Sequence, residues 1–239
     1  MTEALSLVTV VLAALLAFAG VRILQARRES FIRTYMFPPG LFDRLAKRRP
    51  AISLKERQLV ARALRQFFLA YLTGGRRHVS MPSQVADDLW HEFILYTRHY
   101  DEFCSRAFGR FLHHTPAVAL GADRQNNEGL RRVWWRACLE ENINPRKPTR
   151  LPLLFAIDEK LGIEDGFRYA PDCQQLRRRS ETTTAHCGSD LGNGCSGGSG
   201  GGTSSGGGES GSAGDFGGGG GDSGGGGSSG GCSGGCSSD

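Results

Sequence analysis

The stretch SLKERQLVARALRQFFLAYLTGG, residues 53–75, has the strongest helical pattern in the chain. Ser53 and Glu56 form a capping-box sequence at its start, and Gly74-Gly75 ends the pattern. Its apolar residues recur as neighbouring pairs at the spacing of one helix face: Leu59/Val60, Ala63/Leu64, Phe67/Phe68 and Tyr71/Leu72. The sequence therefore predicts a long helix that begins at Ser53 and buries one broad face.

Weaker helical patterns lie on both sides of this stretch. The predicted helices are Leu41–Arg48, a helix from Pro82-Ser83 to about Cys104 or Phe108, a helix from Asn126 or Asn127 through Glu140, and a short one in LPLLFAIDEKLG, closed by Gly162. Clear strand patterns are nearly absent. We therefore expect a mainly α fold, with a compact domain of four to five helices.

The N-terminal stretch ALSLVTVVLAALLAFAGV, Ala4–Val21, contains 18 residues and no charge. As a helix it spans roughly 27 Å, close to the thickness of a hydrocarbon core. Arg22, Arg27 and Arg28 follow it, whereas only Glu3 precedes it, and this asymmetry places the following chain in the cytoplasm. Residues 1–28 are predicted to form a single-pass transmembrane anchor with its basic flank. The alternative is a cleaved signal peptide.

Composition changes sharply near residue 181. Of the 35 glycines, 26 lie in Gly188–Asp239, and such a segment cannot bury an apolar core. All 29 Lys and Arg residues and 18 of the 24 acidic residues lie in residues 1–180. The sequence predicts a basic, helical cytoplasmic domain over residues 29–180 and a disordered Gly/Ser-rich tail over residues 181–239.

The seven cysteines suggest no disulfide framework. Stable disulfides are not expected in a reducing cytoplasm. Cys104, Cys138 and Cys173 are interpreted as small buried residues.

The stretch DDLWHEFILYTRHYDEFCSRAFGRFLHHTP, residues 87–116, concentrates histidines. Asp87 and His91 are four residues apart and can pair on the polar face of a helix. On one straight helix, His91 and Cys104 lie roughly 20 Å apart along the axis and about 140° apart around it, so they cannot share a metal ion unless the helix breaks. If the chain turns back after Gly109, Asp87 and His91 can meet His113 or His114. Adjacent histidines diverge, so one of those two is expected to take part.

Imidazole and carboxylate ligands suit zinc or another divalent cation. The candidate metal ligands are therefore Asp87, His91, His113 and His114. Asp87 could instead orient His91 without touching the ion. The competing interpretation is a polar helix face, with His91 bonded to Asp87 or to a loop carbonyl, since the spacing matches no standard zinc motif. His78 and His99 are interpreted as surface residues.

Three segments carry a family resemblance: MPSQVADDLWHEFILYTRHYDEFC, HHTP, and LPLLFAIDEKLGIEDGFRYAPDC. The Trp90-His91 pair with its preceding Asp, together with Tyr100 and Cys104, is similar to bacterial proteins with a glycine-rich tail related to the glycine-rich domain-containing protein (GRDP-like) family. The likeness covers roughly residues 81–173 and implies no particular reaction. Plant relatives are linked to development and stress, and some contain an RNA-binding segment that is not seen in this chain.

Three functions fit these observations. The first is a membrane-anchored interaction or scaffold module, which would bind an unknown protein partner through an apolar groove ringed by arginines and tryptophans. The second is a metal-binding protein or metal-dependent enzyme that uses Asp87, His91 and His113 or His114. The third is a basic head that binds anionic lipid or nucleic acid, and nucleic acid is the weaker ligand because no dense basic patch with interleaved aromatic residues is present. The sequence has no GxSxG and no Walker loop, so it favours no standard enzyme class.

Overall fold

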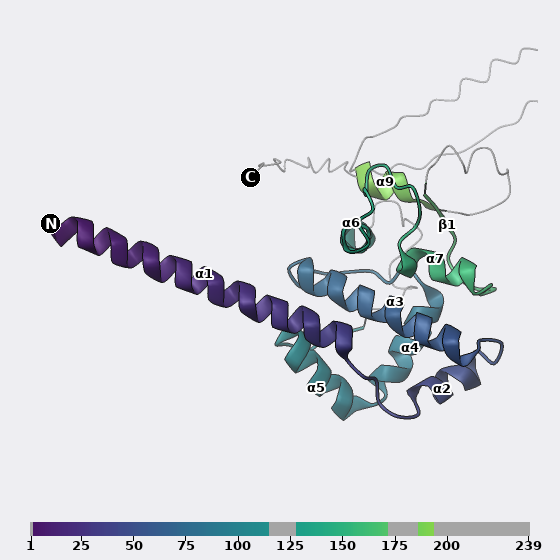
Figure 1. Ribbon diagram of the computed structural model, residues 1–239. Coiled ribbons are helices and arrows are strands. Elements are labelled where there is room, and N and C mark those ends of the chain that lie inside the picture. The colour runs from purple at the N-terminus through teal and green to yellow at the C-terminus, as the bar shows by residue number, and fades with distance from the viewer. Residues whose placement is uncertain (1, 115–127, 172–185, 194–239) are drawn as a thin grey trace, which may run out of the picture. The chain divides into compact units, whose positions relative to one another are not determined.

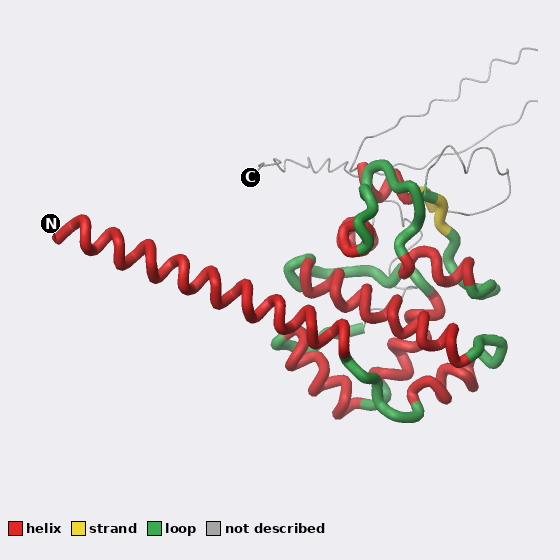
Figure 2. The backbone as a smooth tube through the Cα atoms, viewed as in Figure 1, coloured by secondary structure: helices red, strands yellow, loops and turns green. Residues whose placement is uncertain are grey.

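The computed structural model describes residues 2–114, 128–171 and 186–193. The elements in chain order are α1 (Thr2–Thr34), α2 (Leu41–Arg48), α3 (Leu54–Thr73), α4 (Gln84–Ile94), α5 (Thr97–Phe108), α6 (Glu128–Glu140), α7 (Leu153–Lys160), β1 (Tyr169–Ala170), β2 (His186–Cys187) and α9 (Gly188–Asn193). The two short strands pair in parallel, with Tyr169 opposite His186. Figures 1 and 2 show helices packed around α3, which confirms the predicted mainly α fold.

Helix α3 forms the centre of the domain. Ser53 caps it as predicted: the Ser53 backbone amide donates to Glu56 Oε2 at 2.7 Å, and the Ser53 hydroxyl accepts from the Glu56 amide. The predicted apolar face is buried, and α3 contacts α1, α2, α4, α6 and α7. This explains why the residues 53–73 pattern dominates the sequence.

An aromatic cluster joins α3 to α4 and α5. The ring centroid of Phe68 lies 4.9 Å from Phe103 and 5.9 Å from Trp90, and all three side chains are buried. Burial of one large apolar side chain stabilises a fold by about 1.5–3 kcal/mol. The cluster therefore holds the two helices that carry the histidine-rich stretch against the core.

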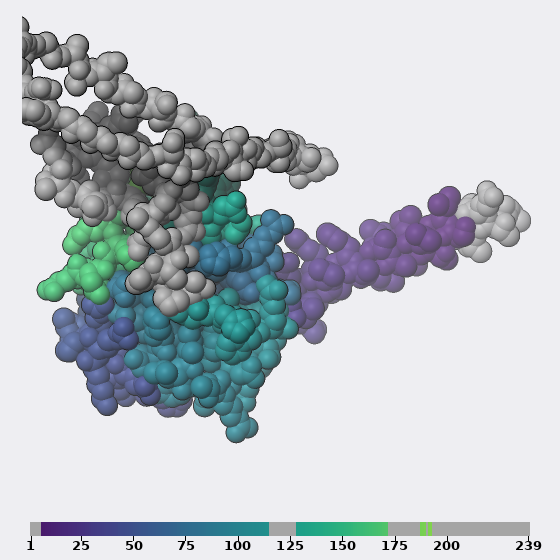
Figure 3. Space-filling model, turned by 180° about the vertical axis from the view of Figure 1, so that it is seen from behind, coloured from purple at the N-terminus to yellow at the C-terminus, as the bar shows by residue number. Residues whose placement is uncertain are grey.

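Helix α1 runs without interruption from the apolar N-terminal stretch into the domain, so it crosses the predicted boundary at residues 28/29. Its C-terminal part packs on the core: Ile32 is buried, and the Tyr35 ring just beyond the helix lies 4.7 Å from that of Phe103. Its N-terminal part projects bare from the body of the domain (Figure 3). The segment Ser6–Thr34 is long and apolar enough to cross a membrane, a test that a signal sequence also passes.

The helix predicted from Ser83 to beyond Cys104 is wrong in one respect, because it breaks at Leu95-Tyr96 into α4 and α5. Neither residue is a glycine or proline, so the sequence carries no local signal for the break. The cause is tertiary: the Tyr96 hydroxyl donates to the Pro39 carbonyl at 3.3 Å and packs against Gly40.

The predicted disordered tail, residues 181–239, contains a short ordered segment. Residues 186–193 form β2 and α9, and Leu191 is buried against the domain. Gly188 permits this packing, because a Cβ at that position would lie 2.4 Å from the Trp134 ring. Cys187 takes part in a disulfide, which contradicts the expectation of no stable disulfide. The remainder of the predicted disordered tail, from residue 194, lies outside the described residues, as does the predicted cap of α6 at Asn126 or Asn127.

Candidate metal centre

Helix α4 presents Asp87 and His91 one turn apart. The predicted i,i+4 pair is present, with His91 Nδ1 3.4 Å from Asp87 Oδ2. His91 Nδ1 also lies 3.0 Å from the Asp87 backbone oxygen. A donor role for Nδ1 in this bond would leave Nε2 with its lone pair for a ligand. Histidines that bind metal ions are commonly oriented by such a bond to a carbonyl.

The start of α4 is fixed by a carboxylate from a distant helix. Asp158 of α7 is buried and accepts hydrogen bonds from the Ser83 hydroxyl at 2.7 Å and from the Gln84 and Val85 amides at 2.7 and 3.2 Å. Its Oδ2 also accepts from the Phe167 amide at 2.9 Å. A carboxylate that accepts from the first amides of a helix satisfies donors that would otherwise be unpaired. Its negative charge also interacts favourably with the positive end of the helix dipole. Asp158 therefore positions the first turn of α4, and with it Asp87.

His114 reaches the same place from the segment after α5. Gly109 ends α5 with a left-handed φ of 73°, and the chain turns back there, which meets the condition for Asp87 and His91 to reach one of the two adjacent histidines. The Trp90 indole donates to the Tyr100 hydroxyl at 3.1 Å, which in turn donates to the Leu112 carbonyl at 2.5 Å. This buried relay fixes the returning segment, and the Trp90 ring then meets the His114 ring edge-on at 4.5 Å.

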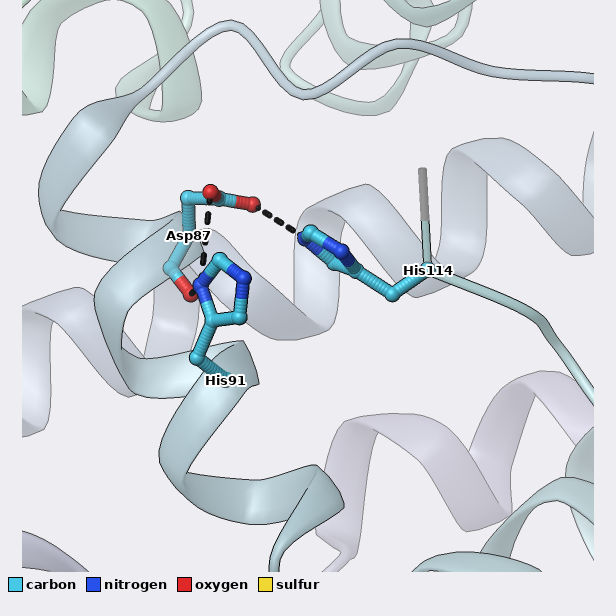
Figure 4. A group of neighbouring side chains, drawn as sticks. All are labelled: Asp87, His91 and His114. Carbon is cyan, nitrogen blue, oxygen red and sulfur yellow. Dashed lines mark hydrogen bonds and ion pairs between the residues drawn. The ribbon is translucent and has the colours of Figure 1, made fainter. Parts of the chain in front are cut away.

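The Asp87 carboxylate contacts both imidazoles, and the His91 and His114 rings lie against one another with centroids 4.1 Å apart (Figure 4). Its Oδ1 is 2.8 Å from His114 Nε2, and one donor atom from each of Asp87, His91 and His114 lies within 4.8 Å of the others. Zinc–nitrogen and zinc–oxygen bonds are about 2.0–2.2 Å long, so ligand atoms around one ion lie roughly 3 Å apart. The 2.8 Å between Asp87 Oδ1 and His114 Nε2 is close to that spacing, and one His91 nitrogen lies within 4.8 Å of both, so the side chains would have to adjust for all three residues to hold one ion.

The cluster is buried on one side and open on the other. The Asp87 and His114 side chains are 6% and 10% exposed, whereas that of His91 is 39% exposed. An ion held here would have protein ligands on its inner side and room for water or another ligand at its outer side. That arrangement is typical of metal sites with an open coordination position.

Of the four candidate ligands, His113 lies outside the cluster, so it is removed from the set. Its side chain is exposed and lies against Phe111 at 4.9 Å, so it stands outside the cluster. Neighbouring residues in extended chain point to opposite sides, which is why one of the pair can face Asp87. His78 and His99 are exposed, as predicted.

Cys104 also lies outside the cluster, even though the helix breaks between it and His91. The thiol is fully buried in the aromatic core, as is that of Cys138, so both are the small core residues expected from the sequence. Burial raises the pKa of Cys104, and it raises the pKa of Cys138 to about 12. Both thiols therefore stay protonated at neutral pH, and the thiolate is the reactive form.

We expect Cys138 to resist alkylation in the folded chain at about pH 8, because a thiol with a raised pKa is almost entirely neutral there. Peptide mapping by mass spectrometry after treatment with iodoacetamide should find Cys138 unmodified in the native protein and modified in denaturant. Rapid modification of native Cys138 would contradict the buried placement.

The partners of Asp88 were not expected from the sequence. Asp88 is fully buried beside Asp87, but its carboxylate faces away, toward Arg48 at 3.0 Å and Arg49 at 2.7 Å. Arg49 also pairs with Asp165 at 2.6 Å. Two guanidinium groups neutralise Asp88, whereas two imidazoles contact Asp87. Asp88 therefore holds α2 on α4, whereas Asp87 is suited to a cation.

A family model described as UCP032817-like matches residues 27–191, which include the described helices from the end of α1 to α9. The chain belongs to the UCP032817-like family. The UCP032817-like match covers Asp87, His91 and His114, and its end agrees with the structure, since Leu191 of α9 is packed on the domain.

Membership of the UCP032817-like family indicates no activity, and neither of the other comparisons indicates one. No curated protein and no solved structure matches the chain. The description UCP032817-like says nothing about glycine-rich domain-containing proteins, so that resemblance stays a prediction.

Proposed function

We propose that this domain is a membrane-anchored metal-binding domain that holds one divalent ion, such as zinc, through Asp87, His91 and His114. The convergence of two imidazoles and one carboxylate within 4.8 Å carries this proposal. The three residues come from two segments that the Trp90–Tyr100–Leu112 relay ties together. Two histidines and one carboxylate are a donor set found in zinc and iron sites.

The exposed side of the cluster supports a role beyond structure. A divalent ion with three protein ligands retains a coordination position for water or a small ligand, where it can act as a Lewis acid or activate water. Trp90 also lines a pocket of about 530 Å³ together with Arg76, Arg110 and His113, but Asp87, His91 and His114 do not line that pocket. The open coordination position by itself would be compatible with a metal-dependent reaction.

The anchor belongs to the same proposal. Helix α1 is long and apolar enough to span a membrane, and its arginine-rich C-terminal flank favours a single pass with the domain in the cytoplasm. The disulfide at Cys187 is more typical of an oxidising compartment and counts against that orientation. Access of an external protease to the domain in intact cells separates the two orientations.

The test is the metal content of the full chain, purified in a mild detergent without chelator and without an affinity histidine tag. We expect about one divalent ion per chain in the parent protein. His91→Ala and His114→Ala should each weaken binding by more than about 100-fold, beyond the loss typical of residues that only support a ligand. His113→Ala is the matched control and should keep the parent's metal content.

Folding of each variant is checked by far-ultraviolet circular dichroism and by the thermal midpoint. Equal metal content in the parent, His91→Ala and His114→Ala would place any ion elsewhere in the chain and overturn the proposal. Absence of metal from the parent, even after addition of zinc, iron(II) or manganese, would overturn it as well.

A further inference from the structure

A second surface feature lies between the C-terminal end of α3 and the outer side of α6. It is a groove of about 690 Å³. Trp135 and Leu139 supply its apolar surface, and Leu139 is 53% exposed. Four arginines also line it: Arg77, Arg131, Arg132 and Arg136. An apolar groove ringed by arginines and tryptophans is the feature expected from the sequence for a module that binds a partner.

The charge of the groove is strongly positive. Glu128 is the carboxylate among the lining residues, and it is paired with Arg132 on the next turn of α6. Arg77 and Arg136 are exposed. The Arg146 guanidinium lies 5.7 Å from the centroid of the Trp135 ring and adds further positive charge at the edge. An occupant of this groove should therefore combine a negative charge with an apolar part.

Helix α1 sets the distance of the groove from the membrane. It leaves the domain on the side where the C-terminal ends of α3 and α5 and helix α6 lie (Figure 1). Arg28 marks this exit, because a Cβ at Gly109 would lie 2.9 Å from its guanidinium. At 1.5 Å per residue, Arg28 lies roughly 10 Å beyond Val21, the last residue of the uncharged stretch. The polar layer on one side of a bilayer is about 5–8 Å thick, so this end of the domain lies near the headgroups.

We propose that the groove binds the headgroup of an anionic phospholipid in the same membrane that holds α1. The arginines would contact the phosphate, and Trp135 and Leu139 would contact the glycerol and upper acyl region. Arginine and tryptophan side chains are well suited to this boundary, where one end of the ligand is charged and the other apolar. The proposal depends on the membrane anchor of the proposed function and is independent of the metal ion.

The test uses the full chain in a non-ionic detergent and reads tryptophan fluorescence. Trp90 and Trp134 are buried, whereas Trp135 is partly exposed in the groove, so Trp135 should give most of the signal. Short-chain phosphatidylglycerol should produce a saturable change. Short-chain phosphatidylcholine and inorganic phosphate at equal concentrations should produce little change, because each lacks one part of the anionic, amphipathic ligand.

Charge-removing variants make the test specific. Arg77→Gln and Arg136→Gln should each weaken phosphatidylglycerol binding about fivefold, the effect of one basic residue near an anionic lipid surface. Arg98→Gln is the control, because Arg98 is 88% exposed on α5 and does not line the groove. The affinity of Arg98→Gln for phosphatidylglycerol should equal that of the parent protein.

Several outcomes would overturn the proposal. They are equal responses to phosphatidylcholine and phosphatidylglycerol, an equal response to phosphate alone, unchanged binding in both Arg77→Gln and Arg136→Gln, or tighter binding of a single-stranded RNA oligonucleotide than of phosphatidylglycerol. His91→Ala should bind phosphatidylglycerol as the parent does. Failure of the lipid site and failure of the metal site are therefore distinguishable.

Discussion

Replacement of Asp158 by alanine is expected to lower the free energy of unfolding by about 3–5 kcal/mol. The substitution removes a buried carboxylate that accepts several charge-assisted hydrogen bonds, and it leaves their donors unpaired. The Ser83 hydroxyl and the Gln84 and Val85 amides would lose their acceptor at the start of α4, and the Phe167 amide would lose its acceptor in the adjoining loop. The thermal midpoint of the full chain in detergent should fall by roughly 10 °C.

Two comparisons show whether Asp158 acts through α4. Asp158→Asn retains one acceptor oxygen and should destabilise less than alanine. Asp101→Ala, at an exposed position of α5, should shift the midpoint little. If Asp158→Ala also weakens metal binding while it stays folded at low temperature, the carboxylate positions Asp87. An unchanged midpoint in Asp158→Ala would contradict the hydrogen bonds described for this residue.

Replacement of Trp134 by alanine should be about equally costly, with a loss of 3–5 kcal/mol that is typical of a fully buried tryptophan. Its ring packs against Phe155 at 5.0 Å, and its indole donates to the Pro145 carbonyl at 3.0 Å. The same ring supports Gly188 at the start of α9. Trp134→Ala should therefore expose the amides of residues 187–193 to hydrogen exchange.

Trp134→Phe is the matched variant, because it keeps an aromatic ring and removes the indole donor. It should cost about 1–2 kcal/mol, the value of one buried hydrogen bond and a small cavity. Urea unfolding followed by circular dichroism measures both variants without reliance on tryptophan emission. Equal stability of the parent and Trp134→Ala would show that α9 and the α6–α7 contact contribute little to the fold.

Local signals in the sequence predicted much of this fold. The capping box of α3, the bounds of α2 and the serine that starts α4 follow from short-range hydrogen bonding and from side-chain periodicity, which a sequence records directly. The break between α4 and α5 could not be predicted, because it depends on a contact between Tyr96 and the Pro39-Gly40 turn.

The candidate cluster shows the same division. The Asp87–His91 pair follows from helix spacing, and the turn after Gly109 follows from glycine's access to positive φ. The choice of His114 over His113 could not be made, because it depends on where the Tyr100 hydroxyl holds the Leu112 carbonyl. The arginines that neutralise Asp88 are the last residue of α2 and the residue after it, about forty positions earlier, and they carry no recognisable spacing.

Residues 186–193 show how composition can mislead. Glycine content assigned them to a disordered tail, since glycine carries no apolar side chain. In the structure, the missing side chain of Gly188 is what allows the backbone to approach Trp134. Glycine therefore favours an ordered structure at this position, because the backbone can pack closely on the large Trp134 ring.

Helix α1 has a mechanical consequence. From Val21 to Thr34 it contains no proline or glycine, and its last turns are fixed in the aromatic core through Ile32. The domain therefore cannot swivel on a flexible linker, and if α1 spans a bilayer as proposed, the domain must follow every rotation and tilt of the helix. One residue inserted after Val21 would turn the whole domain by about 100° around the helix axis and move it about 1.5 Å outward. A change in bilayer thickness that tilts α1 would swing the domain as a rigid lever, and two copies paired through α1 would hold their domains at a fixed relative angle.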